Sequence, residues 1–504
     1  MLHFFRKILF FSLLISTCGC SGQPGPADVD IIPESTDASP APDTHHEDEL
    51  AVFEQNLIDD YQSVLGKMEN ATRYQIDLQI ADTVSDVSGH QEVLYTNNEE
   101  VPLDEIYFRL FPNISGLILT VTNLTVNDTQ LPAILTNKDT AMRVDLPEPL
   151  QPGEQTLIAM DFQQQVPRAM GGNYGLNIYM DDILALDQFF PIIPVYDEDG
   201  WEVQDPPINA DMLFADEAFF RVRVNAPAGL VLAGSGIEVG STNGDQRQEV
   251  IYIGGPQRDF FLAASPRFES VSRKVGGTTI TAYFPGEYRQ AGNLVLETAE
   301  RALNSYNDRF GAYPYIELDL ISTPMNAGGM EYSTATSLSL RYFDADSDAA
   351  NLTFLEAVVA HEVAHQWFFN QVMSDQLQEP WLDEALVQYA TYLYYVDRYG
   401  VNNAQGFVQS WYQRWANVDQ APIPIGKPAG AYTREEYGPI IYGRGPLFFE
   451  ALNETMGEAS FNRLLSAYAD QYRWGIADSQ AFTELAQEIC DCDLSDLLAH
   501  WVKE

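Results

Sequence analysis

The sequence predicts an α+β, multidomain protein in which a β-sandwich-like N-terminal domain precedes a mostly α-helical domain. Three observations support this prediction. The chain has 504 residues, which is more than one hydrophobic core usually organises. Residues 70–270 contain short alternating or β-branched runs, and Gly, Asn, Asp and Pro residues separate them. After about residue 285, apolar residues recur at helical spacing instead.

Acidic residues dominate the composition. There are 73 Asp and Glu residues against 27 Lys and Arg residues, so the formal net charge is −46. The hydrophobic fraction of 45% is ordinary for a folded protein, so this charge does not indicate disorder throughout the chain. Binding to phosphate backbones requires clustered Lys and Arg residues, and we therefore expect no nucleic acid partner.

The N-terminus, residues 1–20, is typical of a secretory signal. Arg6 and Lys7 precede an apolar run that is too short to span a bilayer. Small residues and Cys20 follow, an ending that resembles a bacterial lipoprotein signal with its lipobox. This resemblance implies that Cys20 becomes the lipidated first residue, with Cys18 and an ordinary cleaved signal as alternatives. We expect an exported, cell-envelope lipoprotein that its lipid anchor holds at a membrane.

A linker and a β domain follow the signal. Residues 21–49 are acidic and rich in proline, which favours an extended tether. Residues 50–275 are assigned to the N-terminal β domain, which begins with helical spacing over residues 50–67. Its clearest strand-like segments are 74–80, 106–110, 118–122 and 219–224.

Residues 276–504 form the second predicted domain, which carries the candidate chemistry. One strand is expected over residues 316–322. The expected helices are 293–310, 355–369, 380–399, 407–418, 447–455 and 461–472.

A candidate metal motif, His361-Glu362-Val-Ala-His365, lies in one of these expected helices. The surrounding run contains no Pro or Gly, so a helix is credible, and residues four apart share one of its faces. Both imidazoles could therefore reach one metal ion. Glu362 lies beside them, where it could take a proton from a metal-activated water. The alternative interpretation is a pair of core histidines on a buried helix.

A third ligand is needed, because a catalytic zinc normally takes three protein ligands and leaves one position for water. Glu384 lies nineteen positions after His365 in a second helical run, a gap that allows a turn between the two helices. Asp383 is the alternative ligand, although its helical face differs by about 100°. Glu384 could instead be a surface charge, but its apolar neighbours disfavour exposure. The sequence therefore predicts one Zn²⁺ per chain.

These residues and their spacing resemble the membrane-alanyl-aminopeptidase family of gluzincin zinc metallopeptidases, in a short form without the C-terminal helical domain. The resemblance implies a saddle-like β domain followed by a thermolysin-like catalytic domain. It also implies a zinc-dependent aminopeptidase that hydrolyses N-terminal residues from peptides. His361, His365 and Glu384 would hold the zinc, and Glu362 would act as the general base.

A second motif, Gly328-Gly329-Met330-Glu331-Tyr332, resembles the Gly-x-Met-Glu-Asn exopeptidase motif of that family, with Tyr in place of Asn. In the family this Glu binds the free α-amine of the peptide, and the resemblance assigns this role to Glu331. A carboxylate at one end of a cleft pairs with an ammonium group and sets its distance to the scissile bond. The glutamine that some members place beside it has no clear match.

A third motif, Tyr442-Gly-Arg444-Gly445, resembles the Tyr-x-Lys-Gly segment of the same family. The resemblance implies that Tyr442 donates a hydrogen bond to the oxyanion that develops during hydrolysis. It also places Tyr437 near the site as a second family tyrosine.

One alternative function belongs to another class: a lipid-anchored peptide-binding or scaffold protein with a vestigial metallopeptidase site. Every ligand and base position of the motifs is filled, which favours the enzyme. Cys490 and Cys492 are the cysteines that remain after the signal, and we expect a structural role for them, with their oxidation state open.

Overall fold

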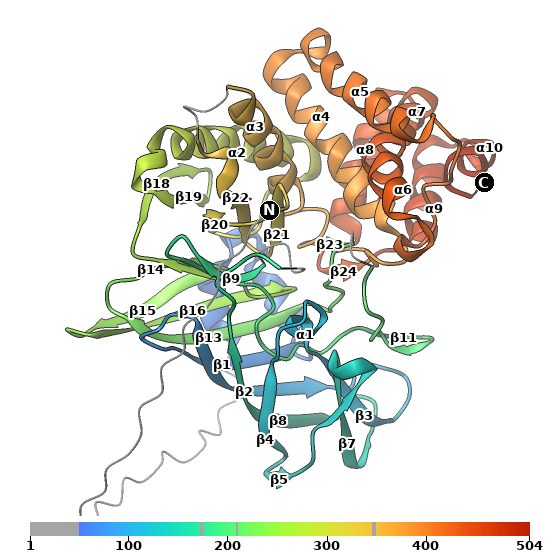
Figure 1. Cartoon of the computed structure of the whole chain (residues 1–504). Helices are drawn as coiled ribbons and strands as arrows, with labels where there is room; N and C mark the ends of the chain where they lie inside the picture. The colour runs from blue at the N-terminus through green and yellow to red at the C-terminus, as the bar shows by residue number, and fades with distance from the viewer. Residues whose placement is uncertain (1–49, 172–175, 208–209, 345–348, 504) are drawn as a thin grey trace, which may run out of the picture. The chain divides into compact units, whose positions relative to one another are not determined.

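A β-rich half precedes a helical half along the chain, as the sequence predicts (Figure 1). The structure is a computed structural model, and it describes residues 50–171, 176–207, 210–344 and 349–503. The predicted signal, the linker and Cys20 lie outside the described residues. Among the helices of these ranges, none is both long enough and apolar enough to pass through a bilayer.

An eight-stranded sheet forms the centre of the β-rich half. Its burial pattern alternates as the sequence predicts, and in β1 the side chains of Ile76, Leu78 and Ile80 are all buried. β1 runs parallel to β13, and the other neighbouring strands are antiparallel. In order across the sheet the strands are β15 (Ile237–Asn243), β16 (Arg247–Gln257), β13 (Ala218–Pro227), β1 (Thr72–Ile80), β2 (Asp86–Thr96), β8 (Gln155–Gln165), β4 (Thr120–Val126) and β5 (Thr129–Gln130).

Smaller sheets and aromatic residues complete this half. Tyr74 of β1 stacks on Phe220 of β13 with ring centroids 4.9 Å apart, and Phe190 contacts both rings. Residues 50–67 form two short 3₁₀ helices, η1 (Leu50–Asn56) and η2 (Asp59–Lys67). The smaller sheets contain β14 (Val231–Gly234), β17 (Leu262–Ser265), β10 (Ile183–Leu186) and β9 (Asn177–Met180); β3 (Leu103–Arg109), β7 (Ala141–Leu150) and β6 (Ile134–Thr136); and β11 (Tyr196–Asp197) and β12 (Gly200–Trp201).

A five-stranded sheet belongs to the second half, where the sequence predicts only one strand. The predicted domain boundary after residue 275 falls in the turn of the β18–β19 hairpin, so β18 pairs within this sheet. The edge strand β21 carries Glu331 and packs against the helix α3 (Ala349–Ala364). In order the strands are β18 (Phe268–Val275), β19 (Thr278–Pro285), β20 (Glu317–Thr323), β22 (Ala335–Ser339) and β21 (Gly329–Tyr332).

Each predicted helix of the second half overlaps a helix of the structure. Two π-helical turns, η6 (Trp381–Ala385) and η9 (Ile440–Arg444), interrupt the regular helices. The main helices are α2 (Arg289–Phe310), α3 (Ala349–Ala364), α4 (Leu386–Tyr399), α5 (Val401–Trp415), α6 (Arg434–Pro439), α7 (Gly445–Met456), α8 (Glu458–Gln471), α9 (Ser479–Cys490) and α10 (Ser495–Leu498). α3 ends at Ala364, earlier than predicted, and turns follow it up to Phe369, whose φ of 153° is outside the helical region.

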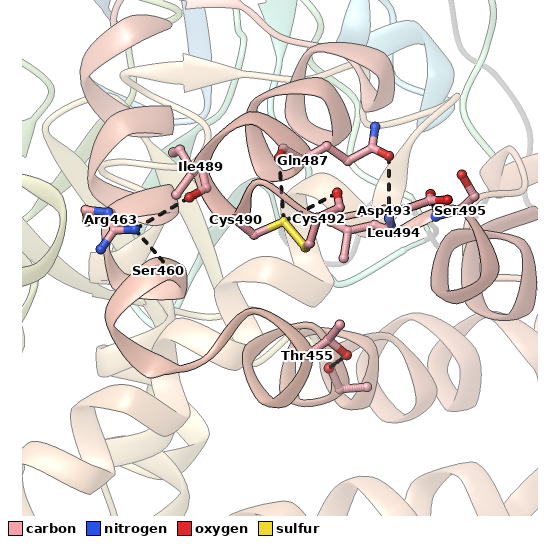
Figure 2. The surroundings of a disulfide bond; sticks show 11 residues. Thr455, Ser460, Arg463, Gln487, Ile489, Cys490, Cys492, Asp493, Leu494 and Ser495 are labelled. Carbon is pink, nitrogen blue, oxygen red and sulfur yellow. Dashed lines mark hydrogen bonds between the residues drawn. A yellow bond between two sulfur atoms is a disulfide. The ribbon is translucent and has the colours of Figure 1, made fainter.

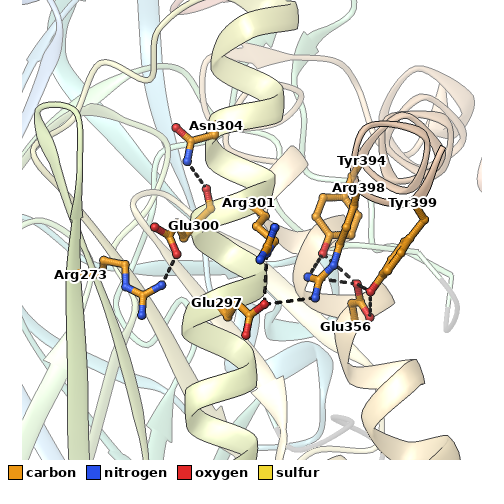
Figure 3. A network of polar contacts seen from close by, with 9 residues as sticks. All are labelled: Arg273, Glu297, Glu300, Arg301, Asn304, Glu356, Tyr394, Arg398 and Tyr399. Carbon is orange, nitrogen blue, oxygen red and sulfur yellow. Dashed lines mark hydrogen bonds and ion pairs between the residues drawn. The ribbon is translucent and has the colours of Figure 1, made fainter.

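A polar network holds α3 against α2 and α4 (Figure 3). The carboxylate of Glu356 on α3 accepts hydrogen bonds from the phenols of Tyr394 and Tyr399 at 2.9 and 2.8 Å. Arg398 lies 3.3 Å from Glu356 and 3.3 Å from Glu297 of α2, so one guanidinium joins the three helices. Together these contacts keep the helix that carries the metal motif in a defined position.

A buried ion pair connects the β-rich half to the loop that follows the metal motif. Arg258, after β16, is 1% exposed and lies 2.9 Å from the carboxylate of Glu217. The same guanidinium donates hydrogen bonds to the carbonyls of Gly475 at 2.7 Å and Asn370 at 3.4 Å. A buried charge is tolerated only with such partners, so this pairing specifies how the two halves meet.

Cys490 and Cys492 form a disulfide at the C-terminal end of α9 (Figure 2). Asp491 between them adopts a left-handed conformation with φ of 50°. Nearby, the side chain of Gln487 accepts a hydrogen bond from the backbone N–H of Leu494 at 3.5 Å. The two cysteines thus take the oxidised state that the sequence left open.

Candidate active site

α3 and the turn after it bring the two histidines of the metal motif together. His361 lies on α3, and the backbone N–H of His365 still donates to the carbonyl of His361 at 3.3 Å. The helical spacing therefore extends to His365, although α3 ends at Ala364. The Nε2 atoms of the two imidazoles are 3.3 Å apart. His365 is fully buried, whereas His361 is half-buried at the wall of a cavity.

Glu384 completes the predicted metal set from the π-helical turn η6. Its Oε2 atom lies 3.1 Å from Nε2 of His361 and 3.8 Å from Nε2 of His365. The turn is anchored by Trp381, whose ring contacts Phe448 at a centroid distance of 5.4 Å and Phe482 at 5.7 Å. A buried Trp at the first position of the turn thus holds the ligand beside the histidines.

The three donor atoms fit a tetrahedral zinc ion. Ligand atoms that lie 2.0–2.2 Å from one tetrahedral zinc are roughly 3.3–3.6 Å apart. The observed separations of 3.1, 3.3 and 3.8 Å bracket this range. Two other clusters of three possible ligands share residues with this one in the described chain, but neither combines two imidazoles with one carboxylate. That combination is a usual catalytic zinc donor set, which makes His361, His365 and Glu384 the candidate metal site.

Asp383 orients a ligand instead of replacing Glu384. Its Oδ1 atom lies 3.0 Å from Nδ1 of His365, on the side of the ring that faces away from the metal position. Its Oδ2 atom accepts a hydrogen bond from Gln376 at 2.7 Å. On the other imidazole, the side-chain amide of Gln388 lies 3.4 Å from Nδ1 of His361. Such partners fix the ring orientation of metal-binding histidines, so the alternative ligand is an outer partner of the site.

Glu362 lies against Gly329, the first residue of β21, and lines the cavity. A Cβ atom at Gly329 would lie 2.3 Å from Oε1 of Glu362, so any larger residue would displace this carboxylate. A Cβ at Gly328 would lie 3.3 Å from Val358 on the same helix. Oε2 of Glu362 is buried and has no hydrogen-bond partner among the described residues. Burial raises the pKa of Glu362 to about 8, which suits a group that accepts and returns a proton.

Glu331 lies on β21 in the same cavity. Its carboxylate, that of Glu362 and a ring nitrogen of His365 all lie within 4.8 Å of one another. Gln376 donates a hydrogen bond to Oε1 of Glu331 at 3.3 Å, and burial raises the pKa of Glu331 well above its usual value. Met330 also lines the cavity. The predicted amine-binding carboxylate is therefore next to the metal position.

Tyr332, which stands where the family motif has Asn, points away from the metal position. Its ring stacks on Phe261 of the β-rich half with centroids 4.1 Å apart and is fully buried. The carbonyl of Tyr332 accepts a hydrogen bond from Gln366 at 2.8 Å. The substitution thus fastens β21 to the neighbouring sheet and leaves Glu331 in place.

Tyr442 comes from the second π-helical turn, η9, and its phenol hydrogen-bonds to Glu384. Its ring centroid lies 6.3 Å from that of His361 and 6.3 Å from that of Tyr437, which is also part of the cavity wall. Burial raises the pKa of Tyr442 well above its ordinary value, so the phenol stays protonated and can donate. Both predicted tyrosines therefore lie at the metal site.

Arg444 holds the turn η9 from behind. It is buried and donates hydrogen bonds to the carbonyls of Ile423, Trp501 and His500 at 2.8–2.9 Å. Its guanidinium also lies 4.7 Å from the ring centroid of Trp501. A planar guanidinium has several donors and can bind three carbonyls at once. Arg444 therefore links the C-terminal residues His500 and Trp501 to the turn η9.

Three further residues line the site without any motif in the sequence. Asp211 and Gln188 come from irregular segments of the β-rich half, and Arg414 comes from α5. Asp211 shares a hydrogen bond with Glu384, and burial followed by the charge of Glu384 raises its pKa well above the usual value. Gln188 is buried with a positive φ of 40°. Composition and periodicity contain no signal for them, because only the contact between the two halves brings them here.

The site opens into a cavity of about 1450 Å³ between the two halves. The cavity is large enough for several amino-acid residues of a peptide. Among its lining residues are His361, Glu362, Glu384, Glu331, Tyr437 and Tyr442.

Comparisons with known proteins agree with this geometry. Residues 294–501 match the Peptidase family M1 domain. Aminopeptidase M1-C from Oryza sativa subsp. japonica is 23% identical over 84% of this chain and 47% of its own length. Aminopeptidase M1 from Arabidopsis thaliana is 23% identical over 77% of this chain and 46% of its own length. The chain thus spans about half the length, or less, of the curated relatives it matches.

Solved structures share the fold. An M1 zinc metallopeptidase from Deinococcus radiodurans superimposes with a TM-score of 0.63 at 21% identity, over 86% of this chain and 94% of its own. A variant of that protein bound to a Tyr-Ser-Ala substrate gives a TM-score of 0.64 at 21% identity, over 86% of this chain and 95% of its own.

Proposed function

Because residues 294–501 match the Peptidase family M1 domain, we propose that the chain is a zinc-dependent aminopeptidase, which removes N-terminal residues from peptides. One observation carries this proposal above the others. Two members of the two-histidine, one-carboxylate metal set, His361 and Glu384, line the same cavity as the buried carboxylate of Glu331. A carboxylate beside the metal position selects substrates whose α-amine is free, which distinguishes an aminopeptidase from an endopeptidase.

Each group in the cavity has a chemical task. Bound by His361, His365 and Glu384, zinc would activate a water molecule and polarise the scissile carbonyl. Oε2 of Glu362 takes a proton from the attacking water and later delivers it to the leaving amine. The phenol of Tyr442 donates a hydrogen bond to the carbonyl oxygen as negative charge develops on it.

Glu331 sets where the chain is cut. Its carboxylate pairs with the α-ammonium group of the peptide, and Gln376 keeps Oε1 oriented through a hydrogen bond of 3.3 Å. Only the first peptide bond then reaches the metal position and Glu362. An N-acetylated peptide would leave the Glu331 carboxylate buried without a cation, which is costly, so such peptides are excluded.

Metal removal and a blocked substrate test this proposal together. We expect chelator-treated protein to lose hydrolysis of alanyl-aminomethylcoumarin, and one equivalent of zinc to restore it. The N-acetyl form of the same substrate should be cleaved at least about a hundredfold more slowly, since a buried unpaired carboxylate costs several kcal/mol. Equal cleavage of both forms would remove Glu331 from its role. Zinc binding without hydrolysis on a broad aminoacyl panel would support the peptide-binding alternative instead.

We also propose that the protein is exported and lipid-anchored through Cys20. The support comes from the sequence: Arg6 and Lys7, the short apolar run and the small residues before Cys20. The acidic tether would then hold the enzyme away from the membrane surface. Radiolabelled palmitate should label the wild-type protein in cells and leave Cys20→Ala unlabelled. Equal labelling of both proteins would contradict the assignment.

A further inference from the structure

Arg414, on α5, is a cationic side chain that the proposed mechanism does not use. It is half-buried and lines the same cavity as the metal set. One of its N–H groups donates to the carbonyl of Tyr442 at 3.3 Å, and its guanidinium carbon lies 5.6 Å from the Tyr442 ring centroid. A guanidinium carries five N–H donors, so most of its donors remain available to a ligand in the cavity.

Several other deeply placed arginines of this acidic chain pair with carboxylates. Arg109 lies 3.0 Å from Asp205, Arg258 lies 2.9 Å from Glu217, and Arg309 lies 2.7 Å from Asp397. Among the ion pairs of the described residues, none includes Arg414. A desolvated cation without a negatively charged partner is costly. An arginine kept in this state inside an active-site cavity is therefore suited to an anion that arrives with the substrate.

Arg414 and Glu331 act on different sides of the metal site. Glu331 groups with Glu362 and His365 within 4.8 Å. Arg414 instead contacts Tyr442, and its positive charge interacts electrostatically with His361 and Glu384. A peptide with its α-amine at Glu331 and its first carbonyl at the metal would continue towards the His361 side. The residues after the scissile bond would then approach Arg414.

We propose that Arg414 binds a carboxylate on the leaving-group side of the substrate, within one or two residues of the scissile bond. This inference rests on the proposed aminopeptidase function and adds a substrate class to it. The carboxylate has two possible sources: the C-terminus of a di- or tripeptide, or an acidic side chain after the cleaved bond. Planar bidentate pairing with a carboxylate is the contact that a guanidinium makes best.

Matched acid and amide substrates test this proposal on the zinc-loaded full chain. One pair is Ala-Ala-Ala and its C-terminal amide, and the other is Ala-Glu-amide and Ala-Gln-amide. We expect wild-type kcat/KM to favour the acid member of at least one pair about tenfold, mainly through KM, because hydrogen bonds between charged groups are the strong ones. The first pair assigns the preference to the terminus and the second to a side chain. The formal net charge of −46 would favour the amides, so an acid preference requires a local cation.

Substitutions of single arginines test whether Arg414 is the cation that binds the substrate carboxylate. Arg414→Gln should bring the acid-to-amide ratio close to one, and Arg414→Lys should keep part of it. Arg463→Gln removes the same charge from the exposed face of α8 and should leave the ratio unchanged. Arg434→Gln removes the other arginine of the cavity lining, which is exposed. Loss of the preference in Arg434→Gln but not in Arg414→Gln would overturn the assignment.

The wild-type protein alone also decides the question, whether or not the variants fold. Ratios near one for both substrate pairs would refute the carboxylate proposal. Cleavage of alanyl-aminomethylcoumarin in the same experiment would show that the aminopeptidase function stands independently. Absence of cleavage on all substrates would mean that the proposed function itself has failed.

Discussion

The metal site combines residues from a regular helix with residues from two irregular turns. His361 and Glu362 lie on α3, and His365 follows with its helical hydrogen bond intact. Glu384 and Tyr442 instead lie on the π-helical turns η6 and η9. π-helical turns occur frequently at functional sites, because the extra residue in the turn redirects a side chain.

The two regions depend on different interactions. The relation between His361 and His365 follows from four residues of helical backbone, which any stable helix supplies. The position of Glu384 depends on Trp381 packing among distant aromatic rings, and that of Tyr442 depends on Arg444 and the C-terminal carbonyls. Local periodicity therefore sets one part of the site, and tertiary packing sets the other. Substitutions on α3 and on the turns η6 and η9 should show which residues act in the hydrolysis and which residues position others.

The largest effect is expected on α3 itself. Glu362→Gln removes the general base but no metal ligand, so kcat should fall about 10²–10⁴-fold while zinc content stays near one equivalent. Steady-state kinetics on alanyl-aminomethylcoumarin and metal analysis of the same sample check this. Glu356→Gln is the matched control on α3: it weakens the network with Arg398 and should lower the free energy of unfolding by about 1 kcal/mol with kcat nearly unchanged. Full activity of Glu362→Gln would contradict the mechanism.

The next largest effect is expected on the turn η9. Tyr442→Phe removes one hydrogen-bond donor to the developing oxyanion, which should lower kcat about 10²–10³-fold with little change in KM. Tyr437→Phe offers a comparison five residues earlier and should lower kcat less than about tenfold, since Tyr442 is the phenol that hydrogen-bonds to Glu384. Measuring kcat and KM separately distinguishes the two residues. A greater loss of kcat in Tyr437→Phe would reverse their roles.

The smallest effect is expected behind the metal ligands. Asp383→Asn weakens the contact of 3.0 Å to Nδ1 of His365 and should lower zinc affinity about 10–100-fold. Competition with a chromophoric chelator measures this affinity directly. Asp397→Asn changes a carboxylate on α4 that pairs with Arg309, and it should leave zinc affinity unchanged. An unaltered affinity in Asp383→Asn would show that the contact with the carbonyl of Phe368 suffices to orient the ring.

Much of the fold and most of the candidate site could be predicted from the sequence. The predicted helix over residues 293–310 corresponds to α2 and the predicted strand over 316–322 to β20, because their apolar patterns are strong and local. Sequence reasoning missed β19 and β22, which are mostly buried on both faces and therefore lack an alternating pattern, and β21, which has only four residues. It also left Asp383 open as a ligand, since helical geometry alone does not show which carboxylate faces the metal.

The sequence by itself determined that His361, Glu362 and His365 lie together, because helical backbone geometry sets their spacing, and it predicted Glu384 and Glu331 as candidates through their resemblance to family motifs. It also determined the acidic character of the chain. Only the tertiary structure decided that Asp383 supports His365, that Asp211 and Gln188 reach the site, and that Arg414 lies in the same cavity without an acidic partner. The physical reason is that these residues come from separate segments. Their meeting depends on side-chain packing between the segments, which one-dimensional periodicity does not encode.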